Sequence, residues 1–153
     1  MIVKCANSII ERTLSELRDA GQHRCECVVL WLGQRNGNYV EVVDIYRPEQ
    51  IARKDMFHIP PASMNALYVE LRHRRLMVAA QVHSHPMEAF HSPADDRWAI
   101  IRHDGALSLV VPYFAINTTT ANFLDQAKIF QFSDDAIWTE VILKEVHSWL
   151  KIT

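Results

Sequence analysis

Two strand-like segments joined by a tight-turn signal constrain the fold more than any other feature. Residues 25–32 form a short apolar run that contains β-branched residues, which is typical of a buried strand. The dipeptide Asn36-Gly37 favours a two-residue hairpin turn, because the central positions of such turns need positive φ angles. Residues 39–46 are therefore expected to return antiparallel to the first strand.

The N-terminal segment predicts a helix over 8–20. Ser8 and Glu11 have the spacing of a capping box, in which each side chain bonds the other residue's backbone amide. Gly21 offers a C-terminal stop. Three apolar residues recur behind the cap at helical spacing: Ile10, Leu14 and Leu17.

The remaining segments show apolar residues either at helical spacing or in the pattern of a strand. Helices are expected over 62–75, after a Pro-Pro pair, and from Pro93 to about residue 103, and strands over 76–85, 107–111, 128–132 and 137–142. Residues 143–150 fit either a closing helix or an extension of the last strand. The mixed order predicts an α+β fold with α-β-α layers, in which helices flank a mixed, mostly antiparallel sheet. The length of 153 residues suits a single domain over 1–153.

Composition narrows the classes of function. Apolar residues make up 49% of the chain and the net charge is −2, so no strong field for nucleic acid or a membrane surface is expected. No apolar run approaches the length of a membrane span, and the N-terminus lacks the pattern of a signal peptide. The three cysteines, Cys5, Cys25 and Cys27, favour buried strand positions in a reducing cytoplasm over a disulfide scaffold.

The segment from His83 to Asp95 carries the strongest chemical signal. Residues two apart on a strand share a face, so His83 and His85 can aim two imidazoles at one point. Asp95, one turn into the next predicted helix, can add an oxygen. Three protein ligands leave a fourth tetrahedral position open, which is the arrangement of a catalytic zinc. A His-x-His pair or a Ser-Pro-x-Asp helix start is common without a metal, but together, with Pro86 directly after His85, they predict a metal site.

These residues resemble the JAMM zinc metalloproteases of the MPN+ domains and the bacterial JAB proteins. That family carries His-x-His-Pro, a short loop and then Ser-x-x-Asp, as in His83 to Pro86 and Ser92 to Asp95 here. It also carries an upstream glutamate followed seven residues later by glycine, which Glu26 and Gly33 match. The resemblance runs from residue 26 to about residue 112, in the family's order of elements.

The resemblance implies a role for each matching residue. His83, His85 and Asp95 would hold one zinc ion per chain. Glu26 would act as the general base that moves a proton from water to the leaving amine, and Ser92 would hydrogen-bond the oxyanion. The implied fold is the cytidine-deaminase-like JAB/MPN fold. A cytidine deaminase's own zinc site is excluded, because the chain has no Pro-Cys-x-x-Cys.

One departure from the family pattern leaves two alignments of the loop. Six residues separate His85 from Ser92, where the family usually has seven. Keeping Ser-x-x-Asp makes Asp95 the ligand, whereas keeping the full count makes Asp96 the ligand and loses the serine. We prefer Asp95, because that alignment preserves the local helix start. His91 lies in the same loop and is extra to the motif.

The resemblance implies a cytoplasmic isopeptidase or peptidase that cleaves after the C-terminus of a ubiquitin-like modifier. Compact bacterial JAB enzymes often accompany ubiquitin-like proteins and their activating or conjugating enzymes, including antiphage defence systems. The expected partner is thus a ubiquitin-like protein or its conjugate, with no nucleic acid and no membrane. Two alternatives remain: processing of a sulfur-carrier protein, and a non-catalytic MPN scaffold. The second is disfavoured by the presence of Glu26, both histidines and Ser92.

Overall fold

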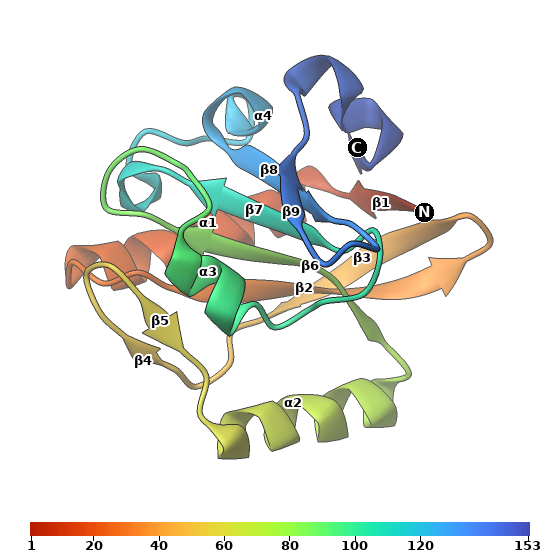
Figure 1. Cartoon of the computed structure of the whole chain (residues 1–153), viewed down its shortest axis with the longest axis horizontal. Helices are drawn as coiled ribbons and strands as arrows, with labels where there is room; N and C mark the ends of the chain where they lie inside the picture. The colour runs from red at the N-terminus through yellow and green to blue at the C-terminus, as the bar shows by residue number, and fades with distance from the viewer.

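A single mixed sheet organises the molecule, and helices cover both of its faces. The computed structural model describes residues 1–153. Helix α1 (Asn7–Gln22) packs on one face, and α2 (Pro61–Arg74) lies across the other, below the sheet in Figure 1. This is the α+β arrangement with helices on both sides of a sheet that the order of the elements predicts.

The large sheet has eight strands in the order β10-β1-β3-β2-β6-β7-β8-β9. Four of its seven pairings are antiparallel and three are parallel. The strands are β1 Ile2–Cys5, β2 Val28–Asn36, β3 Tyr39–Tyr46, β6 Met77–Ser84, β7 Leu107–Val111, β8 Lys128–Phe132, β9 Trp138–Glu140 and β10 Leu150–Ile152.

Several short elements complete the chain. Strands β4 (Ile51–Ala52) and β5 (Phe57–His58) pair in a small separate sheet. The short helical segments are α3 Pro93–Trp98, η1 Tyr113–Ala115, α4 Phe123–Gln126 and η2 Leu143–Ser148.

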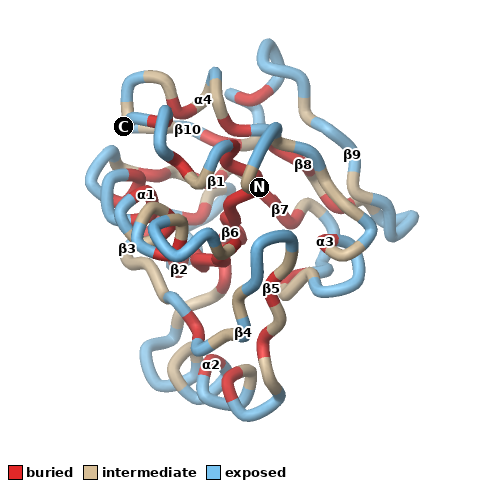
Figure 2. Tube along the Cα trace, turned by 90° about the vertical axis from the view of Figure 1, so that its left-hand side faces the viewer, coloured by how far each residue is buried: buried red, intermediate tan, exposed pale blue.

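Strand β2 shows how the sheet separates two cores. Its residues alternate between faces, as a strand requires. Val29 and Trp31 join the larger core under α1, whereas Val28, Leu30 and Leu32 join a smaller core under α2. The hairpin to β3 is confirmed, but its turn lies one residue later than predicted: Asn36 still pairs with Tyr39, and Gly37, with a φ of 59°, and Asn38 form the turn. Figure 2 shows the result as buried central strands within an exposed periphery.

Helix α1 differs from the prediction at both ends. It begins after Ala6, which has no side-chain cap, so the predicted Ser8–Glu11 capping box is wrong. The chain enters the helix almost directly from β1, which leaves Ser8 already inside the first turn. Gly21 is not the stop, since the helix continues to Gln22. A Cβ at Gly21 would lie 2.5 Å from the Phe114 Cβ, so glycine is needed here for close packing.

Two other predicted elements have different bounds in the structure: β2 starts and ends later than predicted, and α3 is shorter. Strand β2 starts at Val28, because the Glu26 N–H donates to the Arg53 carbonyl in the loop between β4 and β5, 2.6 Å away, and not to a sheet partner. Helix α3 ends at Trp98, where the Ile100 N–H is diverted to the Gln81 side chain. Residues 143–150 are expected to form either a closing helix or an extension of the last strand. They form the 3-10 helix η2, followed by β10, which pairs parallel with β1.

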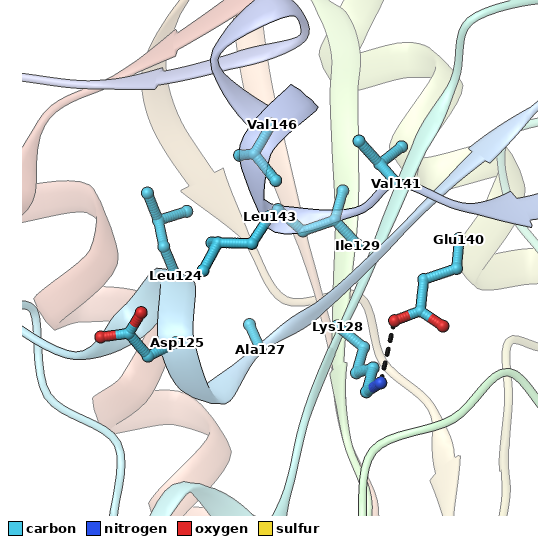
Figure 3. A pocket seen from close by; sticks show the side chains of 9 residues that line it. All are labelled: Leu124, Asp125, Ala127, Lys128, Ile129, Glu140, Val141, Leu143 and Val146. Carbon is cyan, nitrogen blue, oxygen red and sulfur yellow. Dashed lines mark hydrogen bonds and ion pairs between the residues drawn. The ribbon is translucent and has the colours of Figure 1, made fainter.

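A cavity of about 140 Å³ lies between α4, β8, β9 and η2 (Figure 3). Its lining is mostly apolar, and Lys128 and Glu140 form an ion pair at 2.8 Å beside it. It contains none of the predicted site residues. None of the helices combines the length and apolar character that crossing a bilayer requires.

Candidate metal centre

Strand β6 delivers both predicted histidines to one point of the sheet. The strand is internal, so its backbone is held from both sides: His83 is in register with Val28 of β2 and with Val110 of β7. Beyond the strand end, the His85 N–H donates to the Val111 carbonyl at 2.9 Å. The two histidines are therefore fixed on one face, as their spacing predicts.

The third residue arrives at the N-terminus of α3. Ser92 caps this helix: the Asp95 N–H donates to Ser92 Oγ at 3.0 Å, and the Ser92 N–H donates to Asp95 Oδ2 at 2.7 Å. Pro93 follows at the first helical position, where its missing N–H is not needed. This reciprocal cap turns the Asp95 carboxylate back toward β6.

The two imidazoles and the carboxylate converge in a buried cluster. The Nε2 atoms of His83 and His85 lie 3.2 Å apart. Asp95 Oδ1 lies 3.1 Å from His83 Nε2, and Oδ2 lies 3.1 Å from His85 Nε2. Ligands about 2.0–2.1 Å from a tetrahedral metal are separated by about 3.3 Å. The exposed fractions are 0%, 2% and 3%, so the set suits a metal ion in both spacing and donor chemistry.

Electrostatics favour the ligand form of Asp95. Burial acts to raise its pKa, but the positive charge of His83 and the hydrogen bonds from both histidines and the Ser92 amide outweigh burial. The net result is a pKa well below the usual range of an aspartate. A metal ligand must be deprotonated, and Asp95 meets that condition.

Glu26 lies beside the cluster without joining it. Its Oε1 is 3.9 Å from His85 Nε2, while its Oε2 is buried and has no hydrogen-bond partner. Burial raises the pKa of Glu26 to about 8, and the negative charges of Asp95 and Asp55 add to the shift. A carboxyl group with this pKa can both take up and release a proton near neutral pH.

The backbone around Glu26 is held by polar side chains that sequence reasoning did not identify. Ser84 Oγ accepts from the Cys27 N–H at 3.2 Å, and Gln50 bonds both the N–H and the carbonyl of Val28 at 2.8 and 3.0 Å. Gln81, fully buried in β6, accepts from the Ile100 N–H and anchors the chain after α3. Gln81 interrupts the apolar run of β6 from Met77 to Val82, and this was the available sequence signal.

The structure brings Asp95, not Asp96, to the histidines. Asp96 is exposed, and its Oδ1 lies 2.7 Å from His91 Nδ1. This arrangement corresponds to the alignment that keeps Ser-x-x-Asp and accepts a loop one residue shorter. Ser92 lies at the edge of the cluster, half-buried. Its Oγ accepts from Asp95, so its own hydroxyl proton is free to donate.

The cysteines and two tryptophans differ in burial. Cys5 and Cys27 are buried as predicted, but Cys25 is only partly buried. Trp98 is 36% exposed and packs edge-on against His58, so it lies outside both cores. Trp138 is partly buried against Phe132 and the ring of His91.

Comparisons with known proteins place these residues in context. No family model matches the chain. A protein of Sinorhizobium fredii (strain NBRC 101917 / NGR234), described as "Probable metalloprotease y4jG", is 37% identical over 105 residues, which is 66% of this chain and 65% of that protein. The chain thus matches just under two thirds of that relative's length.

A solved structure extends the comparison to the whole chain. The solution structure of protein DSY2949 from Desulfitobacterium hafniense matches with a TM-score of 0.72 at 18% identity, covering 99% of this chain and 93% of that one. At this identity the likeness concerns the fold alone. The relative's description and the buried His-His-Asp cluster together support a metalloprotease family and fit a zinc peptidase.

Proposed function

We propose that the protein is a JAMM-type zinc isopeptidase or peptidase of the JAB/MPN family, formed by one domain over 1–153. Its substrate would be the C-terminal tail of a ubiquitin-like modifier, joined to a target or carried as a precursor. The observation that carries the proposal is the buried convergence of His83, His85 and Asp95, with Glu26 next to them but outside the ligand set.

The donor set supports a hydrolytic site more than a structural one. Structural zinc sites are usually closed by four protein ligands, whereas three ligands leave one position for reactants. A zinc ion held by the three side chains would supply Lewis acidity, which lowers the pKa of water and polarises a carbonyl. The chain's own residues must then move the protons and stabilise the oxyanion.

Glu26 fits the proton-transfer role by position and by chemistry. Its unpartnered Oε2 is a free acceptor in a water-poor setting, and its Oε1 faces His85. The carboxylate can take a proton from the attacking water and release it to the leaving amine. Ser92 Oγ keeps a free hydroxyl proton beside the cluster, so it can donate to the oxyanion.

The experiment that tests the proposal replaces Glu26 with glutamine. Glu26→Gln keeps the size and polarity of the side chain but removes the proton acceptor. We expect the variant to fold and bind zinc as the wild type does, while cleavage of a ubiquitin-like protein fused through its tail to a reporter falls by about 10²–10⁴-fold. The readouts are zinc content by elemental analysis and turnover of the fusion.

Glu11→Gln supplies the matched control, because Glu11 is exposed on α1 and makes no contact with the cluster. It should cleave at the wild-type rate. If Glu26→Gln also cleaves at that rate, Glu26 is not the base. If the wild type holds zinc but cleaves no such fusion, the proposed modifier substrate is wrong.

A further inference from the structure

Two buried ring nitrogens close to the metal centre have no hydrogen-bond partner. One is Nδ1 of His83, and the other is Nε2 of His91. The two rings lie 6.3 Å apart between centroids, in an edge-to-face arrangement. Buried polar atoms are rarely left unpaired, because an unmet hydrogen bond in the interior costs about 1–3 kcal/mol.

His91 is held with one nitrogen outward and the other inward. Its side chain is only 5% exposed, and it packs between Phe130 and Trp138 at centroid distances of 5.1 and 5.0 Å. Nδ1 lies 2.7 Å from the Asp96 carboxylate, which can only accept. The proton of neutral His91 therefore sits on Nδ1, and Nε2 carries a free lone pair inside the protein.

His83 presents the complementary group. Its Nε2 faces His85 and Asp95, so in a metal-loaded site this nitrogen is deprotonated and Nδ1 carries the proton. Metal-binding histidines almost always donate that second N–H to a carboxylate, a carbonyl or a water. No side chain or carbonyl of the chain accepts it here.

We propose that His91 is a positioning residue for the metal centre, linked through one ordered water to His83 and oriented by Asp96. The water accepts from His83 Nδ1–H and donates to His91 Nε2, because the two nitrogens make no direct bond and a centroid separation of 6.3 Å is compatible with one water between the rings. The inference rests on the proposed metal site. It assigns a function to a residue that the protease motif does not include.

Two variants separate the hydrogen bond from the packing. His91→Phe keeps an aromatic ring between Phe130 and Trp138 but removes both nitrogens, whereas His91→Gln keeps an amide that can accept the bond. We expect His91→Phe to weaken zinc affinity by about 10–100-fold, measured by competition with a chromophoric chelator. His91→Gln should recover most of that loss. Trp138→Phe alters the same aromatic contacts but leaves the ring nitrogens of His91 and the Asp96 carboxylate in place. Its zinc affinity should stay within about twofold of the wild-type value.

A second measurement uses only the wild-type protein, so it does not depend on any variant folding. Long-range ¹H–¹⁵N correlation of the histidine rings in the zinc-loaded protein should place the protons of His83 and His91 on Nδ1. A proton on Nε2 of His91 overturns the proposal, as does wild-type zinc affinity in His91→Phe. If the wild type binds no zinc, the metal site itself fails. If the wild type binds zinc and the replacement of His91 leaves the zinc affinity unchanged, only this inference is overturned.

Discussion

The Asp95 carboxylate both caps a helix and faces the histidines. Oδ2 accepts the Ser92 N–H while facing His85, and Oδ1 faces His83. Because one side chain makes all these contacts, the start of α3 and the geometry of the cluster are coupled. Its neighbour Asp96 contacts only His91 by its side chain.

Replacing each aspartate in turn should therefore have unequal effects. Asp95→Ala removes a ligand and a cap, so we expect no stoichiometric zinc and a loss of about 1–3 kcal/mol in the free energy of unfolding of the metal-free protein. Asp96→Ala should retain one zinc per chain, with weaker affinity through His91. Elemental analysis and denaturant titration measure both effects. The opposite pattern would mean that Asp96 is the ligand.

The three cysteines should differ sharply in reactivity. Burial raises the pKa of the Cys5 and Cys27 thiols to about 12, although Arg47 lowers that of Cys27 in part. Only the thiolate is nucleophilic, so these two should resist iodoacetamide at pH 8 in the native state. Cys25 is partly exposed and should be alkylated first. Peptide mass mapping checks the order, and modification of all three at one rate would contradict it.

At the scale of elements, the contact between α1 and η1 depends on a missing side chain. Gly21 lets the helix approach Phe114, which itself has a φ of 51°. Arg18 reinforces this contact by donating to the carbonyls of Ala115 and Thr118. The His85 N–H donates to the Val111 carbonyl, and η1 begins just after Val111. The packing of α1 against η1 therefore also supports the backbone at one edge of the site.

Gly21→Ala should accordingly destabilise the protein even though alanine favours a helix. The added methyl group would overlap Phe114, and overpacking of this kind costs about 1–3 kcal/mol. Ser15→Ala, at an exposed position of the same helix, tests propensity alone and should be neutral or slightly stabilising. Urea unfolding of both variants measures the difference. Equal stability of the two would show that the Phe114 contact is not tight.

At the scale of the whole molecule, a metal would tie together segments that are distant in sequence. The candidate ligands come from β6, from His85 directly after it and from the start of α3, and Glu26 comes from the chain before β2. The unfolded chain does not hold these residues together. A metal should therefore bind the folded state preferentially and stabilise it by mass action.

Thermal unfolding should report this linkage. Zinc at a hundredfold excess over its dissociation constant adds about 2.7 kcal/mol, which corresponds to roughly 5–10 °C in the melting temperature for a chain of this size. Excess chelator should remove the gain. His83→Ala should show no zinc-dependent shift at all. An equal shift in that variant would place the bound zinc elsewhere.

The local chemistry of the site was predictable because it is encoded over short distances. Alternation on a strand puts His83 and His85 on one face, and Ser92 to Asp95 encode a helix start, so each half of the cluster follows from nearest neighbours. Likewise the Asn36-Gly37 signal located the hairpin, although the turn itself is formed by Gly37 and Asn38. The Ser8–Glu11 capping box failed because the entry of α1 is set by its connection to β1 and not by side-chain caps.

By itself the sequence determined the longer helices and strands, apart from their bounds, and the types of the candidate ligands, because periodicity and turn chemistry act through neighbouring residues. Only the tertiary structure decided which atoms meet. The backbone bond from Glu26 to Arg53 and the burial of His91 between Phe130 and Trp138 join segments far apart in the chain. Such contacts depend on strand order and on loops that close over the sheet. No local sequence pattern encodes these contacts, because they form and stabilise the protein only once the sheet has brought the distant segments together.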